Sequence, residues 1–376
     1  MRSRSTWRYI LAVSLLGSAV AGCAKEAPDT PEDLPEGPTV RELNVLELQE
    51  TDSEFVGLPM ALAIEAGTGD YLVFDFHNGS ALRFDRTGGL VRKYGRRGTS
   101  ITDVNSLTAG YTTEDHVVLI DHGSNLLRSY DLVSGAITDT VRFYGFIGTY
   151  VPFAEHAPWL GSTHRMQTEQ DSNFLRAWRA GTTDLPLGGP LPRDYFDMSV
   201  LKVHSGAVVI EWLDRIVVAP MAANGIVLFG PTGVPSDTLA VPALRRRGVS
   251  RTRVRRAGND ITDFVNSVSR LAAMNVGADS ALVLVHDDAT TNKKKQLRSK
   301  LFVSVIDSQG TRACVDGMLS IEAQSQVNVQ IRADTIFALY QVNDGQERAT
   351  RIATFLIELT RCSWTNLQRG ASLLLD

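Results

Sequence analysis

The stretch Gly69–Gly89, GDYLVFDFHNGSALRFDRTGG, decides how the chain is interpreted, because a second stretch repeats it. It contains an apolar run that ends in Asp75, a polar turn, and a second run that ends in Asp85. Forty-six residues later, DHVVLIDHGSNLLRSYDLVSG has the same order of features, with Asp121 and Asp131 again ten residues apart. Each unit therefore has the pattern of two short strands joined by a polar turn.

Repeats of about this length, made of short strands and turns, are typical of β-propeller blades. We therefore expect an all-β fold, a six-bladed β-propeller over residues 41–376, although five or seven blades would also fit the pattern. A third blade is assigned to the irregular part of the chain, with strands at Ser162–Gln167 and Phe174–Arg179, because there is room for one there. A leading strand, Glu42–Leu48, is expected to pair near Ile352–Leu359 and so to join the two ends of the chain.

The segment Leu244–Met274, between the expected fourth and fifth blades, does not follow the repeat. Its first part, RRRGVSRTRVRR, contains seven arginines. Apolar residues then recur at helical spacing, which predicts a short amphipathic helix capped by Asn259 or Asp260. These apolar positions are Ile261, Phe264, Val265, Val268 and Leu271.

The arginine cluster has two interpretations. Arg245, Arg246 and Arg247 could bind an acidic partner, lipid head groups or an anionic polysaccharide. The alternative is a solvated loop in which the arginines pair with nearby acidic residues.

Residues 1–22 have the composition of a secretory signal peptide. Arg2, Arg4 and Arg8 form a basic start, and the apolar run after them is shorter than the roughly 20 residues that span a bilayer. The run Val20-Ala21-Gly22-Cys23 resembles the lipobox of bacterial lipoproteins, in which the cysteine thiol accepts a diacylglycerol. The resemblance implies a mature chain that is anchored to a membrane through a lipidated Cys23. The alternative is an ordinary signal peptide followed by a chance cysteine.

Residues 23–40 predict a tether between that anchor and the propeller. The stretch Lys25–Thr39 is rich in proline and acidic residues and has almost no apolar content, so it is expected to be extended. Position 24 is Ala and not Asp, so the inner-membrane retention signal of enteric-type bacteria is absent. We therefore expect an outer-membrane location in a Gram-negative host, with the periplasmic or the surface face left open.

Charge and cysteine content agree with export. The net charge is −4, and loss of a leader with three arginines and no acidic residue makes it about −7, which argues for solubility and against a nucleic-acid partner. With Cys23 lipidated, Cys314 and Cys362 are left as a pair, and we expect a disulfide between them. The alternative is two buried free thiols.

Acidic and histidine residues gather near the ends of several expected strands. If these ends share one face, they could line a polar mouth that holds a divalent cation or a cationic ligand, and no other cofactor is expected. For Asp75 and Asp121 we favour a structural role, in which the carboxylate accepts hydrogen bonds from the backbone of the following turn. The full set is Asp75, His77, Asp121, His122, Glu211, Asp214, His286 and Asp287.

A glycine- and proline-rich connection before the third blade contains five aromatic residues. Exposed aromatic side chains on rigid loops often anchor interfaces, and the alternative is that these fill the core of a blade with little other apolar content. They are Tyr144, Phe146, Tyr150, Phe153 and Trp159.

The unit GDYLVFD…LRFDRTGG, with the Arg92-Lys93-Tyr94-Gly95 that follows, resembles NHL-type repeats. It is similar in particular to the six-bladed propeller lipoproteins of environmental bacteria, over residues 58–141. These proteins have few assigned activities, so the resemblance implies a fold and a location. The wider family includes lactonases and amidating lyases that hold a metal in the central channel, but the inner strands expected here, Met60–Ile64 and Val327–Ile331, contain no His or Cys.

The sequence contains no local motif of an active site. It has no nucleophile elbow, phosphate-binding glycine loop, Cys-x-x-Cys pair or HExxH helix. We therefore predict a platform in the bacterial cell envelope that binds an envelope protein, a glycan or a small ligand. The competing hypothesis is a lactonase-, lyase- or hydrolase-like propeller enzyme with a metal in its channel.

Overall fold

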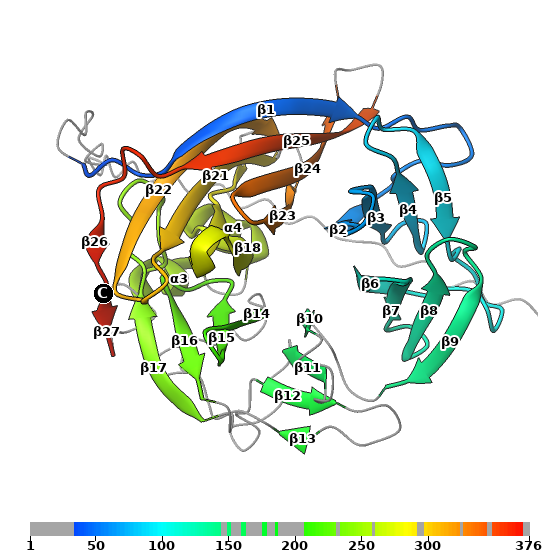
Figure 1. Ribbon diagram of the computed structural model, residues 1–376, viewed down its shortest axis with the longest axis horizontal. Helices are drawn as coiled ribbons and strands as arrows, with labels where there is room; N and C mark the ends of the chain where they lie inside the picture. The colour runs from blue at the N-terminus through cyan, green and yellow to red at the C-terminus, as the bar shows by residue number, and fades with distance from the viewer. Residues whose placement is uncertain are drawn as a thin grey trace, which may run out of the picture. The chain divides into compact units, whose positions relative to one another are not determined.

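In the computed structural model, the regular structure of the described residues is mainly antiparallel β-sheet. It describes residues 34–143, 207–230, 234–257, 260–291, 297–323, 326–343 and 348–370, together with the backbone of four short strands between residues 149 and 186. Within residues 35–376 the sheets are arranged around a central axis (Figure 1). The prediction of an all-β propeller is confirmed.

Five sheets are described with their side chains, and in each the main strands follow one another from the centre outward (Figure 1). The first blade consists of β2 (Pro59–Ile64), β3 (Tyr71–Asp75), β4 (Ser80–Phe84) and β5 (Leu90–Tyr94). The second consists of β6 (Leu107–Thr112), β7 (His116–Asp121), β8 (Leu126–Asp131) and β9 (Ile137–Arg142). The fourth consists of β14 (Ala207–Trp212), β15 (Arg215–Pro220), β16 (Gly225–Phe229) and β17 (Pro235–Ala240).

The last two blades are larger. The fifth consists of β18 (Arg270–Val276), β19 (Leu282–Asp287), β21 (Leu297–Ile306) and β22 (Arg312–Ala323), with the short β20 (Thr290–Thr291) beside β21. The sixth consists of β23 (Asn328–Arg332), β24 (Thr335–Asn343), β25 (Arg348–Glu358) and β1 (Thr39–Glu47).

A sheet of four short strands follows the second blade in the sequence and is described by its backbone pairing alone. Its strands are β10 (Thr149–Val151), β11 (Trp159–Ser162), β12 (Leu175–Trp178) and β13 (Leu185–Pro186). The expected strand Phe174–Arg179 corresponds to β12, whereas Ser162–Gln167 falls mostly outside the described residues. Six sheets are thus present in the topology, and five of them have described side chains.

The two ends of the propeller are joined in the sixth blade. Strand β1 pairs antiparallel with β25, for example Val45 opposite Ala353, and therefore provides the outermost strand of a blade whose other strands come from the end of the chain. This confirms the expected pairing of the leading strand.

Apolar packing lies mainly between neighbouring blades. All five residues of β3 are buried, because alternate side chains point to opposite sides of the sheet and a blade lies on each side. Leu72 and Phe74 pack with Leu119 of the second blade, and Val73 packs with Leu339 of the sixth. Each such side chain contributes about 1.5–3 kcal/mol when fully buried.

The segment before the fifth blade differs from its predicted form. Two short helices are present, α3 (Arg251–Ala257) and α4 (Ile261–Ser267), and Asp260 caps α4 by accepting hydrogen bonds from two backbone N–H groups. The predicted helical stripe was wrong beyond Ser267, since Leu271 belongs to the inner strand β18. Beyond these helices, the described residues contain the single 3₁₀ turn Ala278–Ser280. None of the described helices has the length and apolar content needed to span a membrane.

The last residues of the predicted tether belong to the folded domain, which begins at Pro35. The carbonyl oxygen of Pro35 accepts a hydrogen bond from Arg245 Nη2 (2.8 Å), and that of Glu36 accepts one from Ser363 N (2.9 Å). The expectation of an extended tether up to residue 40 was therefore wrong for its final residues. Proline-rich composition does not prevent binding to a strand edge when the backbone carbonyls find donors there.

The close approach of this segment to β22 depends on two glycines. A Cβ atom on Gly37 would lie 2.5 Å from the carbonyl oxygen of Val315, and one on Gly317 would lie 2.0 Å from that of Pro38. Neither space could hold a side chain without movement of the backbone.

The C-terminal segment covers the outer edges of two blades. Strand β26 (Thr365–Asn366) pairs with β22, and β27 (Gln368–Arg369) pairs with β17. A disulfide between Cys314 and Cys362, with Cα atoms 5.9 Å apart, ties this segment to β22. The predicted disulfide is confirmed.

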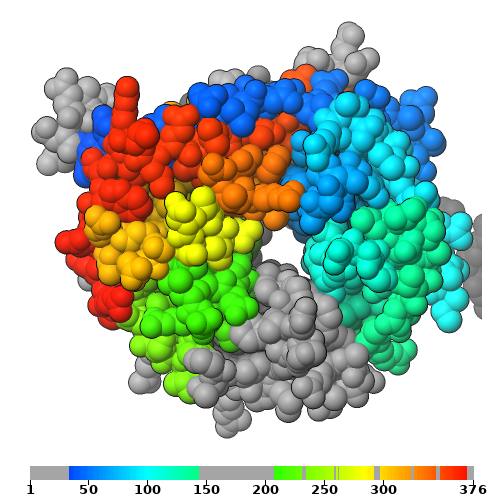
Figure 2. Space-filling model, viewed as in Figure 1, coloured from blue at the N-terminus to red at the C-terminus, as the bar shows by residue number. Residues whose placement is uncertain are grey.

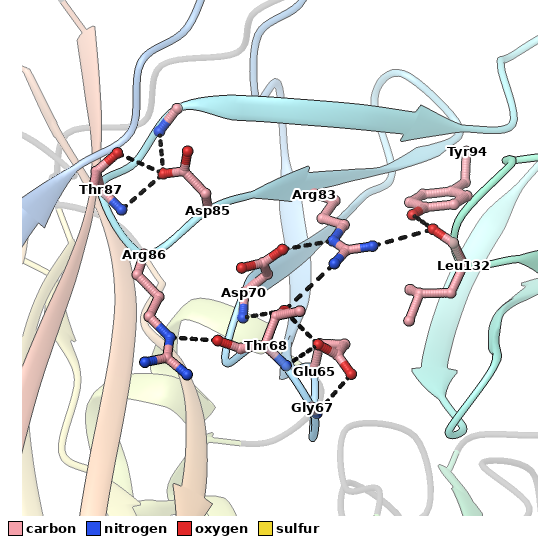
Figure 3. Close-up of polar contacts among 11 residues, drawn as sticks. Glu65, Gly67, Thr68, Asp70, Arg83, Asp85, Arg86, Thr87, Tyr94 and Leu132 are labelled. Carbon is pink, nitrogen blue, oxygen red and sulfur yellow. Dashed lines mark hydrogen bonds and ion pairs between the residues drawn. The ribbon is translucent and has the colours of Figure 1, made fainter.

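A polar network joins the first blade to the second (Figure 3). Arg83 Nε donates to Asp70 Oδ2 (2.7 Å), and Arg83 Nη1 donates to the carbonyl oxygen of Leu132 (3.1 Å), which also accepts from the Tyr94 hydroxyl (2.6 Å). Leu132 directly follows β8, so these bonds cross the boundary between blades. The boundary between the first and second blades thus includes polar contacts as well as apolar packing.

Candidate functional site

The inner strands begin, and the second strands end, on one face of the propeller. The registers pair Pro59 with Asp75, Leu107 with Asp121 and Arg270 with Asp287, so these three aspartates occupy equivalent positions in three blades. These three strand ends therefore share a face. We call this the pocket face, after the cavity that opens there.

Asp75 has a structural role. Its buried carboxylate accepts hydrogen bonds from the backbone N–H groups of Gly57 (2.6 Å), Leu58 (2.8 Å) and His77 (2.9 Å), and from Asn78 Nδ2 (2.7 Å). It therefore fixes the segment that leads into β2 against the turn after β3. The predicted hydrogen bonding to the following turn is present, and the sequence did not predict the second set of bonds.

Asp121 has the same role in the second blade. Its carboxylate accepts hydrogen bonds from Asn105 N (3.0 Å), Ser106 N (2.8 Å) and Gly123 N (3.0 Å), and from Arg128 Nη1 (2.7 Å). Burial acts to raise the pKa of Asp121, but these hydrogen bonds outweigh it and hold the pKa below its usual value. Asp121 is thus an ionised structural group.

The two histidines that follow these aspartates are placed outside the cavity lining. His77 is exposed, and its ring lies near that of Phe55, with centroids 6.4 Å apart. His122 packs edge-on against Phe143, with centroids 5.1 Å apart. Neither histidine is among the residues that line the cavity described below.

Glu211 was misplaced by the sequence analysis. It lies near the end of the inner strand β14, where it pairs with Ile216 of β15, and Asp214 lies in the turn between these strands. This turn is at the opposite face, because the pocket-face end of the hairpin is the pair Ala207 and Pro220. The reason for the error is that Glu211 ends a first strand, whereas Asp75 and Asp121 end second strands.

His286 and Asp287 point to opposite sides of the fifth blade, as successive residues of a strand do. His286 is buried, and burial together with the nearby Arg246 guanidinium holds its pKa well below the usual range, so the imidazole is neutral at pH 7. Asp287 instead lines the cavity. The sequence singled out both residues, and only Asp287 belongs to the candidate site.

Arg246 and Arg247 make side-chain contacts within the fold, whereas Arg245 is held there by its backbone. Asp316 Oδ2 accepts hydrogen bonds from the backbone N–H of Arg245 (2.8 Å), and the fully buried Arg246 side chain lies 3.3 Å from Asp316 Oδ1. Arg247 Nε pairs with Asp288 Oδ1 (2.5 Å). Arg246 and Arg247 thus pair with nearby acids, as in the alternative interpretation. The Arg245 side chain is exposed and donates to the carbonyl oxygen of Pro35.

The cavity lies at the mouth of the central channel and has a volume of about 290 Å³. Figure 2 shows the opening at the centre of the ring. Its described walls come from the starts of β2, β18 and β23, from Gly110 of β6 and from the turn after β15. Its polar groups include Arg270, Asp287, Asn328 and Gln330.

Two charged groups in this cavity have unused hydrogen-bonding capacity. Asp287 Oδ2 lies 3.6 Å from Arg270 Nη2, beyond hydrogen-bond length, and Asp287 Oδ1 and Arg270 Nε have no hydrogen-bond partner among the described residues. Burial raises the pKa of Asp287, although the Arg270 guanidinium opposes the shift. Such an unsatisfied buried charge is a frequent feature of functional sites.

Sequence reasoning missed Arg270, because the segment around it was assigned to a helix. A signal was nevertheless present, because the apolar run Leu282–Asp287 needs an inner strand before it to complete a blade. The seven residues before Gly277, RLAAMNV, were the only stretch in the right place to supply one.

Other predicted features lie outside the described side chains. Cys23 precedes the described part of the chain, and the five loop aromatics from Tyr144 to Trp159 have no described side chain. Among the residues with described side chains, no group of three His, Cys, Asp or Glu is placed to hold a metal ion.

Comparisons with known proteins show the fold and no family. No protein-family model matches the sequence, and a search of curated proteins found no match. A Bacteroides fragilis protein whose name describes it as exported has a similar structure, with a TM-score of 0.55 and 12% identity over 87% of this chain and 97% of that one. A member of the DUF4221 family from Bacteroides vulgatus has a TM-score of 0.58 and 6% identity over 89% of this chain and 100% of that one. At these identities the similarity shows a shared fold alone.

Proposed function

We propose that this protein is a lipid-anchored binding protein of the bacterial cell envelope that holds a small ligand at the mouth of its channel. The observation that carries the proposal is the cavity itself, where the Arg270 guanidinium and the buried Asp287 carboxylate lie among apolar side chains such as Leu62 and Met221. Small-molecule sites are concave and largely apolar, with a few convergent polar groups.

The rigidity of the walls supports a binding role. The described lining comes mostly from the inner strands of several blades. Each of these strands is hydrogen-bonded to the second strand of its blade, and apolar clusters between blades hold them further. A ligand that enters such a site orders few side chains, so little of the interaction energy is lost to conformational entropy.

The location of the protein is supported by two features of the chain. The Cys314–Cys362 disulfide fits an oxidising compartment, where disulfides persist. The lipobox-like run that ends in Cys23 supports an anchor, and the folded domain begins at Pro35.

The anchor is tested by growing cells that make the full-length protein with an alkyne-labelled fatty acid. The wild type is expected to take up the label and to be found with the membranes. Cys23→Ala is expected to lose the label. Equal labelling of both forms, or labelling of neither, would contradict the anchor.

The ligand site is tested by native mass spectrometry of the full-length protein purified from its own envelope. Ala272 lines the cavity, so Ala272→Trp is expected to fill it and to remove any bound small molecule. Val133 is 76% exposed in the turn after β8, and Val133→Trp is the matched control that should keep the bound mass. A bound mass that survives Ala272→Trp, or no bound mass in any form, would overturn the proposed site.

A further inference from the structure

We infer that the ligand of this cavity is a free α-amino acid, with its ammonium group against Asp287 and its carboxylate against Arg270. The inference rests on the proposed ligand site and names the chemistry that would occupy it. It depends on three observations. Asp287 differs from the equivalent aspartates of the repeat, Arg270 beside it also has an atom without a hydrogen-bond partner, and the other walls include apolar side chains.

Asp287 departs from the role of its counterparts. At the equivalent register position, Asp75 and Asp121 each accept at least four hydrogen bonds, including backbone bonds from the segment that leads into their inner strand. In the fifth blade the next residue, Asp288, accepts a backbone hydrogen bond from Arg247 N (3.2 Å), which lies before α3 and not in the segment that leads directly into β18. Asp287 Oδ1 has no hydrogen-bond partner among the described residues.

The unpaired Oδ1 of Asp287 is difficult to explain by stability, because a buried charged oxygen without a hydrogen bond destabilises the folded state. Burial raises the pKa of Asp287, and Arg270 and the Ser299 side chain oppose that shift without cancelling it. The Arg270 guanidinium, 3.6 Å away, compensates the charge only in part, because that distance is too long for a hydrogen bond. The Asp287 side chain lines the cavity, where a ligand donor can supply a further hydrogen bond to the carboxylate.

Arg270 likewise has a hydrogen-bond donor without a partner among the described residues. It is the first residue of β18 and is paired in register with Asp287, so both groups start from adjacent strands of one blade. Its side chain is 29% exposed and its Nε is buried without a hydrogen-bond partner among the described residues. A guanidinium in this state is suited to a carboxylate, with which it forms short, charge-assisted hydrogen bonds.

The combination of the two groups selects the charge of the ligand. A simple cation would be attracted by Asp287 and repelled by Arg270, and a simple anion would meet the reverse. A divalent cation would also need several oxygen ligands, whereas Asp287 is the one carboxylate in the described lining. A ligand with an ammonium and a carboxylate on neighbouring atoms satisfies both side chains at once.

The size and walls of the cavity agree with a single amino acid. A volume of about 290 Å³ lies at the lower end of the range for small-molecule sites, so a long peptide or a large cofactor would not be enclosed. Met60, Leu62 and Met221 provide apolar and adaptable surface beside the charged pair. We therefore expect preference for amino acids with apolar side chains.

The test is isothermal titration calorimetry of the full-length protein against the twenty free L-amino acids, starting with leucine and methionine. The strongest binder is then compared with its methyl ester, which lacks the carboxylate charge, and with its N-acetyl derivative, which lacks the ammonium. Each derivative is expected to bind at least tenfold more weakly than the parent amino acid.

Two variants assign each end of the ligand to its partner. Asp287→Asn is expected to weaken the free amino acid at least tenfold and to have much less effect on the N-acetyl derivative. Arg270→Gln is expected to weaken the free amino acid similarly and to have much less effect on the ester. Circular dichroism and the melting temperature show that each variant is folded, and Val133→Trp again serves as the control.

The outcomes separate this inference from the proposal on which it rests. If no free amino acid binds, or if ester and N-acetyl derivatives bind as tightly as the parent, the amino-acid assignment is wrong. If the native protein nevertheless carries a small molecule that Ala272→Trp displaces, the ligand site stands with another occupant. If Ala272→Trp leaves all binding unchanged, both are wrong.

Discussion

Arg128 Nη1 donates a hydrogen bond to Asp121 Oδ2 over 2.7 Å, and both side chains are buried. Asp121 also accepts from the backbone of Asn105 and Ser106, just before β6, while Arg128 lies on β8. The pair therefore links the start of the inner strand to the third strand of the same blade. An arginine inside an otherwise apolar blade is stabilised because its charge is matched there.

We expect Asp121→Ala to reduce the free energy of unfolding by about 3–5 kcal/mol, because it leaves the Arg128 charge buried without its partner. Urea unfolding followed by circular dichroism measures the change. Glu47→Ala is the control, since Glu47 pairs with Arg351 at the surface, where both side chains are more than a third exposed. That variant should lose less than about 1 kcal/mol. Equal losses for the two variants would show that the buried pair contributes no more to the free energy of unfolding than the surface pair does.

The same carboxylate predicts a pH dependence. The pKa of Asp121 is lower in the folded protein than the value near 3.9 of an unfolded chain. The stability that its ionised form contributes is therefore present above about pH 4 and is lost as the pH falls through the folded pKa. We expect the difference in unfolding free energy between the wild type and Asp121→Asn to be constant from pH 5 to 7 and to shrink below pH 4. A difference that grows in acid would contradict this sign.

The fold could be predicted from the sequence where the side chains on both faces of a strand are apolar. The runs before Asp75 and Asp121 are apolar throughout because each lies between two blades, and the polar turns after them repeat at the same spacing. The third blade has no such run. The helical pattern from Ile261 to Leu271 misled because a helix and a strand follow each other directly, and apolar residues of the strand continued the helical spacing by chance.

The site could be predicted only in part. Asp287 was found because it follows an apolar run, as Asp75 does. Its difference from Asp75 could not be seen, because it depends on which donors the fold brings to the carboxylate and on Arg270 of a neighbouring strand. Likewise, the partners of Arg246 and Arg247 lie more than 40 residues away along the chain, so no local spacing could indicate that these arginines are internal.

The disulfide is expected to be a major source of stability for the fifth blade. Cys314 and Cys362 are 48 residues apart, and closing a loop of that size stabilises the fold by about 4 kcal/mol in the chain-entropy account. We expect Cys362→Ser to lower the melting temperature, and dithiothreitol to lower that of the wild type and not that of the variant. A wild type unaffected by full reduction, checked by thiol titration, would contradict this expectation.

The N-terminal segment should be sensitive to a single methyl group on β22. A Cβ on Gly317 would lie 2.0 Å from the carbonyl oxygen of Pro38, so Gly317→Ala forces the two backbones apart. We expect a loss of about 1–3 kcal/mol, as overpacking typically causes. Gly230→Ala is the matched control, because its nearest contact would be 3.9 Å away. Faster proteolysis near Pro35 in Gly317→Ala, and not in Gly230→Ala, would locate the disturbance.

Asp287→Asn is expected to stabilise the protein at neutral pH in the absence of ligand. The pKa of Asp287 is raised by burial, so the folded state disfavours the charged form more than the unfolded state does. For a raised carboxyl pKa, stability falls as the pH rises from the unfolded value near 3.9 through the folded value. The variant should therefore melt at a higher temperature than the wild type at pH 7. This gain should be smaller at pH 4, close to the unfolded pKa, where little of the cost of charging Asp287 in the folded state has accumulated.

Thermal melts of the ligand-free wild type and Asp287→Asn at the two pH values measure this gain. Asp121→Asn is the matched control, because it replaces an aspartate at the equivalent register position and should destabilise the protein at pH 7. Opposite effects of the same substitution at the two positions would mean that the repeat uses one aspartate for folding and keeps the other at the expense of stability. Proteins retain such a residue when activity or binding needs it. A loss of stability in Asp287→Asn at pH 7 would instead make Asp287 a structural residue like its counterparts.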